Sequence, residues 1–363
     1  MTDSFQANCL PLLVGSLPIN DHKEAIKLVM NHTPEIPLWV QLPAYREEGM
    51  IEQFAPGLPG LKTKKDKAYI DTTDTNFDNQ ILEFYEDYMA VTEGEKDISD
   101  SRFILTDDTA KGFHVLTDYL NSLSTPPVAV KGQITGPFTF TTALCDQNKK
   151  AIFYNDQLRD VAIKLLALKA MWQVKQLSKF KSPVIIFFDE PALAGFGSSE
   201  FTSISHDDIS NCFGEVIEAV HAQGGLAGVH VCANTDWSVV LESPADIISF
   251  DAYSFFDKFI LYPDLIKKFI ETGKILAWGI VPTGNHEDIE KETTDSLVTQ
   301  WEDKARAIEA LGIGRTKILD QSLITPSCGT GSLSLDLAKK VLRLTSEVSD
   351  RLKTMYHINV ANT

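Results

Sequence analysis

Eight short apolar segments, separated by longer segments of helical character, constrain the fold of this chain more than any other feature. Within each segment the apolar residues follow one another without alternation, and most are Val, Ile, Leu or Phe. Such runs are typical of parallel strands that are buried on both faces. The predicted strands are Leu10–Gly15, Pro37–Leu42, Pro127–Lys131, Val184–Phe188, Leu226–Val231, Asp246–Phe250, Ile275–Trp278 and Thr316–Leu319.

Helical periodicity fills most of the intervals between these strands. Ser205 to Asp208 is a good N-terminal capping sequence for a helix over Asp207–Gln223, which ends before Gly224 and Gly225. The other expected helices are Asn79–Val91, Thr109–Leu123, Leu158–Phe180, Pro263–Thr272, Glu287–Leu311 and Ser334–Leu352. Strands that alternate with helices predict an α/β protein, and eight of them favour a closed (β/α)8 TIM barrel over an open sheet.

The interval between the second and third predicted strands, residues 43–126, is much longer than the others. It contains a Pro/Gly-rich segment at 56–61, a basic stretch from Lys62 to Lys67, a candidate hairpin and two of the expected helices. The segment has too few apolar residues for a core of its own. We therefore expect a single barrel domain over 1–363, with 43–126 as an insertion packed beside or over the barrel mouth.

Charge and cysteine content limit the partners and the compartment. The net charge of −17 repels nucleic acids and anionic membranes, so we expect neither as a partner. No apolar run reaches the ~20 residues that span a bilayer, and the first residues lack the layout of a signal peptide. The five cysteines are widely spaced and form no disulfide framework, which predicts a reducing, cytoplasmic environment.

Metal-binding residue types follow several of the predicted strands. His230 and Cys232 end the fifth strand, Asp251 follows the sixth, and Cys328 follows the eighth. Because function in this fold sits at the carboxyl ends of the strands, these side chains can meet at one point. Two sulfurs, one nitrogen and one oxygen suit tetrahedral Zn²⁺ and argue against Mg²⁺ or Ca²⁺. The alternative is a packed His–Cys pair, a cysteine in a Gly-rich turn and an aspartate that caps a helix.

Four further polar residues are candidates for substrate binding. Asp189 and Glu190 emerge from a wholly apolar strand, where carboxylates bind a ligand amine or act in acid–base chemistry. They could instead form a salt bridge with a neighbouring loop. Ser16 follows the first predicted strand and Gln133 follows the third, each in a segment that contains Gly. Such segments allow a ligand to approach the backbone closely, or simply form tight turns.

The chain resembles the zinc-dependent methyltransferases related to cobalamin-independent methionine synthase and uroporphyrinogen decarboxylase, over nearly its whole length. The matching segments are Val14–Pro18, Asp189–Leu193, His230-x-Cys232, Asp251 and Pro326–Gly329. The segment His230–Thr235 is also similar to the corrinoid-dependent coenzyme M methyltransferases. The resemblance implies that His230, Cys232 and Cys328 are catalytic zinc ligands, with Asp251 in place of a glutamate ligand. It also implies that Ser16 and Asp189 bind the amino-acid part of a homocysteine-like thiol.

The reaction implied by this resemblance is methyl transfer to a thiol that zinc holds as a thiolate nucleophile. Two departures from methionine synthase concern the methyl donor. The chain has no room for a second, N-terminal barrel, and Gly279–Thr283 lacks the functional histidine of the corresponding segment. We therefore expect a methylated corrinoid as donor, carried on a small protein or free as methylcobalamin, rather than folate.

Two other functions remain open at this point. A decarboxylase of the uroporphyrinogen type needs no metal and uses basic groups to bind several carboxylates, but the expected barrel mouth offers few Arg or Lys. A non-catalytic module would capture zinc and a thiol, or a corrinoid, without turnover. Measurements of bound zinc and of methyl transfer would separate these alternatives.

Overall fold

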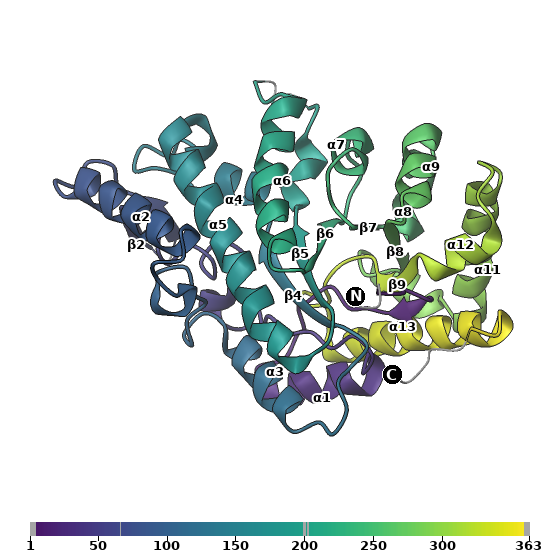
Figure 1. The fold of residues 1–363 in the computed structure, drawn as a ribbon. Coiled ribbons are helices and arrows are strands. Elements are labelled where there is room, and N and C mark those ends of the chain that lie inside the picture. Colours follow the sequence, from purple (N-terminus) through teal and green to yellow (C-terminus); the bar gives the residue numbers. More distant parts are fainter. Residues whose placement is uncertain (1–4, 66, 199–200, 202, 359–363) are drawn as a thin grey trace.

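The computed structural model describes residues 5–65, 67–198, 201 and 203–358. Its centre is a curled, seven-stranded sheet in the order β1–β9–β8–β7–β6–β5–β4, and each neighbouring pair is parallel (Figure 1). The strands are β1 Leu10–Pro11, β4 Val130–Thr135, β5 Val184–Asp189, β6 Leu226–Val231, β7 Ile247–Phe250, β8 Ile275–Val281 and β9 Ser322–Pro326. The prediction of an α/β protein with a buried parallel sheet is confirmed.

The second predicted strand, Pro37–Leu42, does not form a regular strand. Isolated parallel bridges nevertheless join Leu38 to Lys131 of β4, and Gln41 to Ser16, which follows β1. The segment therefore links the two edges of the seven-stranded sheet. The closed eight-stranded barrel and the treatment of 43–126 as an insertion stay predictions.

The eighth predicted strand, Thr316–Leu319, is wrong. These residues belong to the helix α12, Arg315–Asp320, and the strand β9 begins only at Ser322. Ile318 and Leu319 are buried within this short helix. An apolar run of two residues does not distinguish a strand from one turn of a buried helix, which explains the error.

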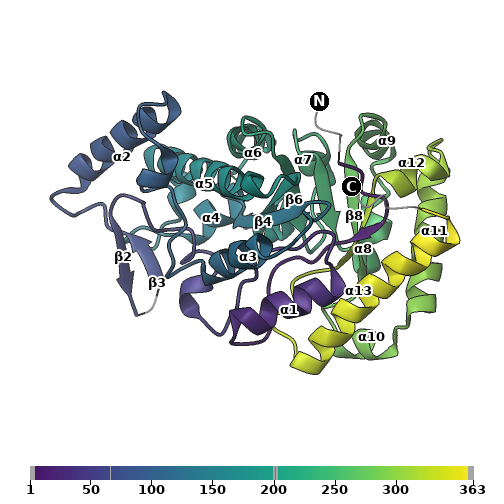
Figure 2. The ribbon, with the colours of Figure 1, turned by 60° about the horizontal axis from the view of Figure 1, so that its bottom comes forward.

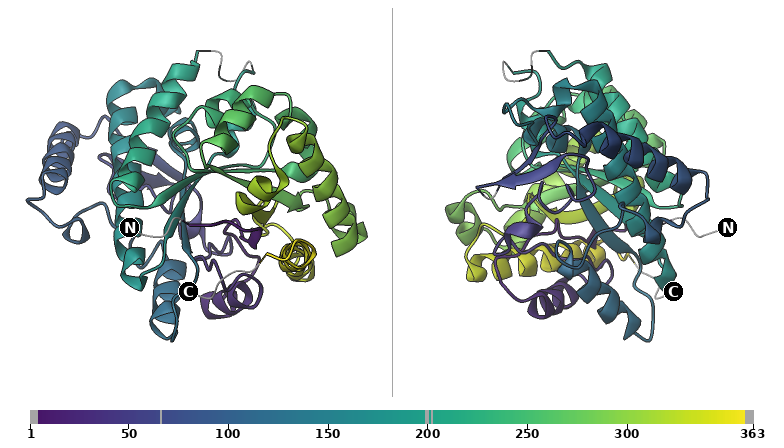
Figure 3. Two further views of the ribbon diagram at one scale, coloured as in Figure 1. Left: turned by 45° about the vertical axis from the view of Figure 1, so that its right-hand side comes forward. Right: turned by 90° about the vertical axis from the view of Figure 1, so that its left-hand side faces the viewer.

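The helices are α1 His22–His32, α2 Phe77–Thr92, α3 Lys111–Asn121, α4 Pro137–Ala143, α5 Asp156–Leu177, α6 His206–His221, α7 Trp237–Leu241, α8 Ala252–Phe259, α9 Pro263–Glu271, α10 His286–Lys291, α11 Thr294–Glu309, α12 and α13 Leu335–Met355. Most of them surround the curled sheet, whereas α2 lies apart from the sheet, beyond α5, as three further views show (Figures 2 and 3). The capping role of Ser205 in α6 is confirmed. Among the described residues, no helix has the length and apolar character needed to cross a membrane.

One predicted helix, Glu287–Leu311, is divided into α10 and α11. The division occurs because Thr293 caps α11, with its side chain accepting the backbone N–H of Ser296. The candidate hairpin of the long interval is confirmed, with β2 Leu61–Lys64 antiparallel to β3 Lys67–Ile70. The basic stretch 62–67 lies on this hairpin, apart from position 66, which is outside the described residues.

Apolar side chains form two separate clusters. The larger one lies between the sheet and the helices. The smaller one contains Leu10, Leu12, Phe187, Ala277 and Leu323, which come from four strands and the segment after β1. Because neighbouring side chains on a strand face opposite ways, this smaller cluster fills the inside of the curled sheet. Space for a ligand therefore remains at the carboxyl ends of the strands.

A fully buried lysine on α5 makes stability depend on pH. The Lys169 ammonium donates to the Ile104 carbonyl at 2.8 Å, and burial lowers the pKa of Lys169 to about 7. The unfolded chain keeps this proton up to the ordinary pKa of 10.5, so stability rises as the pH increases from about 7 to 10.5. Lys169→Met removes the buried charge. Near pH 7, loss of the buried charge should stabilise the protein by at most on the order of 4 kcal/mol. The Ile104 carbonyl loses its donor in this variant, which should reduce the gain by about 1–3 kcal/mol.

Urea unfolding of both proteins between pH 6.5 and 10 measures this difference. The advantage of Lys169→Met should shrink as the pH rises, because the wild-type lysine becomes neutral in both states. Lys175→Met is the matched control, since Lys175 lies on the same helix but pairs with Asp97 at the surface. A Lys169→Met variant that is less stable than the wild type at every pH would contradict the argument.

Candidate metal and substrate site

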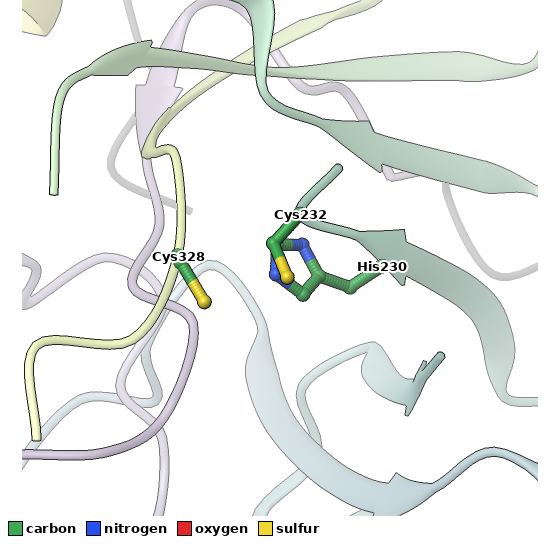
Figure 4. Close-up of side chains that lie close together, drawn as sticks. All are labelled: His230, Cys232 and Cys328. Carbon is green, nitrogen blue, oxygen red and sulfur yellow. The ribbon is translucent and has the colours of Figure 1, made fainter. Parts of the chain in front are cut away.

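His230, Cys232 and Cys328 come together at the carboxyl ends of β6 and β9 (Figure 4). His230 lies in β6 opposite Asp189 of β5, and Cys232 follows the end of β6. Cys328 lies in the loop after β9, which the Thr330 N–H fastens to the Ser16 carbonyl at 3.0 Å. A ring nitrogen of His230 and both cysteine sulfurs all lie within 4.8 Å of one another. These three sequence-predicted ligands are thus adjacent in space.

The electrostatics of this group favour a thiolate. The hydrogen bond with the Cys328 thiol lowers the pKa of Cys232, and His230 lowers it further against the effect of burial. The same bond and burial raise the pKa of Cys328. A cation that binds both sulfurs would displace their protons, because a metal ion binds the deprotonated thiol.

The histidine supplies a test of whether a metal fits here. His230 is only 3% exposed, and its Nε2 has no nitrogen or oxygen partner of hydrogen-bond geometry among the described residues, with the Cys232 side chain close beside the ring. A buried nitrogen without a partner is costly unless something absent from the chain itself contacts it. One imidazole and two thiols are also the donor types that Zn²⁺ prefers. On both grounds the residues present fit Zn²⁺.

Asp251, the fourth sequence-predicted ligand, lies outside this group of three. It is the N-cap of α8, and its carboxylate accepts the Ser254 N–H at 2.7 Å. Burial raises the pKa of Asp251, and the charges of Cys232 and His230 also act on it. Asp251 thus lies near the group of three, but its carboxylate caps a helix, which is the alternative role given for it above.

A cavity of about 750 Å³ opens over the three residues. His230, Cys232 and Cys328 line it, together with the predicted substrate-binding residues Ser16 and Asp189. The Asp189 Oδ1 is buried and has no hydrogen-bond partner among the described residues. Burial raises the pKa of Asp189, while His230 and Lys131 oppose this rise. An acceptor without a donor beside His230 and Cys232 is suited to a ligand that carries an ammonium or hydroxyl group.

Gln133 and Glu190 are not among the residues that line this cavity. Gln133 donates to the Trp39 carbonyl at 2.7 Å and accepts from Lys131 at 3.3 Å. Glu190 accepts the backbone N–H groups of Phe138 and Thr139 at the start of α4. Burial raises the pKa of Glu190 to about 7 despite these bonds. Both side chains are thus bonded within the scaffold and lie outside the lining of this cavity.

The sequence prediction did not single out one wall of the cavity. Tyr45, Arg46 and Met50, from the start of the interval 43–126, line it. This segment is anchored because the buried His22 and Glu48 side chains lie 2.6 Å apart, and the Thr135 hydroxyl donates to the Met50 carbonyl at 2.6 Å. No local motif marks these residues, since their position depends on how the segment folds back over the strand ends.

Comparisons with known proteins give a fold and no family. No family model matches the sequence, and no curated protein sequence matches it. A methyltransferase from Methanosarcina mazei is similar in structure, with 12% identity, a TM-score of 0.51, and coverage of 95% of this chain and 94% of that one.

Two further structures are less similar. One is a B12-independent methionine synthase from Shewanella sp. W3-18-1, with 19% identity, a TM-score of 0.47 and coverage of 68% of each chain. The other holds the GH20 catalytic modules of a pneumococcal exo-β-D-N-acetylglucosaminidase, with 10% identity, a TM-score of 0.47, and coverage of 95% of this chain and 85% of that one. At these identities, the likeness to the Methanosarcina mazei methyltransferase establishes a shared fold and leaves function to be argued from the site.

Proposed function

We propose that this protein is a zinc-dependent S-methyltransferase with a thiol acceptor. The observation that carries the proposal is the group of His230, Cys232 and Cys328 in the lining of an open cavity, with their ligand atoms within 4.8 Å of one another. Three protein ligands and an open side are typical of catalytic zinc sites, whereas structural sites are closed by four. We propose that the acceptor thiol takes the fourth position, with Asp251 as the alternative fourth ligand.

When bound, zinc would lower the pKa of the acceptor thiol and keep it as a nucleophilic thiolate. The chain's own residues would orient that thiol. With zinc bound, His230, Cys232 and Cys328 would position its sulfur, and the cavity that they line offers space for a methyl donor. In the proposed displacement, a thiolate electron pair would form the new carbon–sulfur bond as the donor's bond to the methyl group breaks, and the electron pair of that broken bond would stay with the donor.

We propose that the acceptor carries an amino group, as homocysteine does. The unpaired Asp189 Oδ1 is buried beside the metal ligands and would accept an ammonium hydrogen. The Ser16 hydroxyl also faces the cavity and accepts the Gly331 N–H at 3.2 Å. For the donor we propose a methylated corrinoid, bound to a carrier protein or free as methylcobalamin.

The charges of the cavity disfavour a decarboxylase that binds several carboxylates. Its lining includes the carboxylates of Glu48, Glu52 and Asp189 against the cations of Arg46 and Lys67. A substrate with many carboxylates would meet repulsion from these three carboxylates. A non-catalytic zinc and thiol or corrinoid module remains the second candidate, because it would use the same three ligands.

The test uses zinc-loaded protein mixed with methylcobalamin and either homocysteine or coenzyme M. We expect methyl transfer, faster with homocysteine because coenzyme M lacks the amino group that Asp189 would accept. Release of protons on thiol addition without methyl transfer would instead identify the binding module. A protein that binds neither zinc nor thiol would rule out both.

A further inference from the structure

We infer that Ser249 is a positioning residue for the metal centre: its hydroxyl, 2.9 Å from the His230 Nδ1, takes the part of acceptor for the Nδ1–H and thereby leaves Nε2 free to bind the metal. This inference rests on the proposed function, since it assumes that His230, Cys232 and Cys328 hold Zn²⁺. It concerns a residue that was not a candidate in the sequence and that does not itself line the cavity.

The contact between the two side chains is short and buried. The Ser249 Oγ lies 2.9 Å from the His230 Nδ1, and the two residues are 0% and 3% exposed. They are directly opposite each other in the parallel pair β6–β7, so the strand register sets the contact. The two ring nitrogens are therefore in different states: Nδ1 has a partner, and Nε2 has no nitrogen or oxygen partner among the described residues.

The residue beside Ser249 on the neighbouring strand β8 does not compete with His230 for the Ser249 hydroxyl. On its other side Ser249 pairs with Ala277 of β8, whose methyl group cannot form a hydrogen bond. Asp251, which follows the end of β7, is held by the Ser254 N–H as the cap of α8. Neither neighbour competes for the bond with His230.

The bond determines which nitrogen can bind a metal. A neutral imidazole has one N–H donor and one acceptor nitrogen, and the partner of one nitrogen sets the state of the other. With Ser249 as acceptor, the proton stays on Nδ1 and the lone pair of Nε2 points at the site. Without Ser249 the ring can carry its proton on Nε2 or rotate, and either change removes a ligand. Loss of such a supporting contact typically costs about 10–100-fold in metal affinity.

Ser249→Ala tests the inference through two measurements that do not depend on turnover. Competition with a chelator should give a zinc dissociation constant about 10–100-fold higher than that of the wild type. In the zinc-free protein, at a pH where the ring is neutral, ¹⁵N NMR of His230 should show the Nδ1–H form in the wild type and a shift toward the Nε2–H form in the variant. Ser249→Thr keeps the acceptor oxygen and should restore both properties.

Ser349→Ala is the matched control. Ser349 lies on α13, away from the site, and is also fully buried. Its hydroxyl donates to the Cys9 carbonyl at 2.7 Å. This variant should lose stability without a change in zinc affinity. Unchanged zinc affinity or an unchanged His230 tautomer in Ser249→Ala would overturn the inference, as would weak zinc binding by a folded Ser249→Thr. A wild-type protein that binds no zinc would instead overturn the proposed function.

Discussion

Cys232→Ser and Cys328→Ser should each abolish stoichiometric zinc binding, with affinity more than about 100-fold below that of the wild type. The expected loss exceeds the 10–100-fold that removal of a supporting residue costs, because a ligand atom itself is lost. A serine hydroxyl does not replace it, since it keeps its proton near neutral pH, whereas a cysteine thiol loses its proton when a metal ion binds it. Elemental analysis of the purified proteins, followed by chelator competition, measures the effect.

The zinc affinity of the wild type should also fall as the pH is lowered. Protons compete with the metal for both cysteine sulfurs and for the His230 nitrogen, so binding must release them. Cys145→Ser provides the control, because Cys145 is a partly exposed cysteine outside the group of three. If both Cys232→Ser and Cys328→Ser kept one zinc per chain, these residues would not be the ligands and the proposed function would fall with them.

The sequence was sufficient to predict that His230, Cys232 and Cys328 meet, although almost 100 residues separate Cys328 from the other two. The prediction worked because parallel strands all end at the same edge of the sheet, so it needed only the strand assignments near the ligands. It survived the misplaced eighth strand because Cys328 follows both the predicted segment and the true strand β9. Asp251 differs, since an aspartate after a strand serves equally well as a helix cap.

The sequence could not separate residues that face the ligand from residues that hold the scaffold. Asp189 and Glu190 are adjacent at one strand end, yet Asp189 lines the cavity and Glu190 binds the start of α4. Which of the two neighbouring carboxylates faces the cavity depends on where α4 begins in space. That position is set by tertiary packing, which the local sequence does not show. Ser249 had a weak signal: a polar residue inside an apolar strand, two positions before Asp251.

Gly112→Ala should destabilise the protein by about 3 kcal/mol or more, the upper range for overpacking of a tightly packed contact. A Cβ atom at Gly112 would lie 2.0 Å from the backbone oxygen of Val40, and 3.1 Å from the Val40 nitrogen and carbonyl carbon. The first turn of α3 therefore rests directly on the segment that links the two edges of the sheet. A backbone atom cannot rotate away as a side chain does, so either α3 or the segment has to move.

Gly214→Ala separates this clash from the ordinary effect of a methyl group in a helix. Gly214 lies in α6, and a Cβ atom there meets no heavy atom within 4 Å. The same substitution should therefore stabilise the protein by about 0.5–1 kcal/mol, because alanine loses less backbone entropy than glycine. Urea denaturation of the two variants measures whether each substitution raises or lowers the free energy of unfolding. A Gly112→Ala protein as stable as the wild type would mean that α3 does not pack on Val40, and that the edges of the sheet are joined differently.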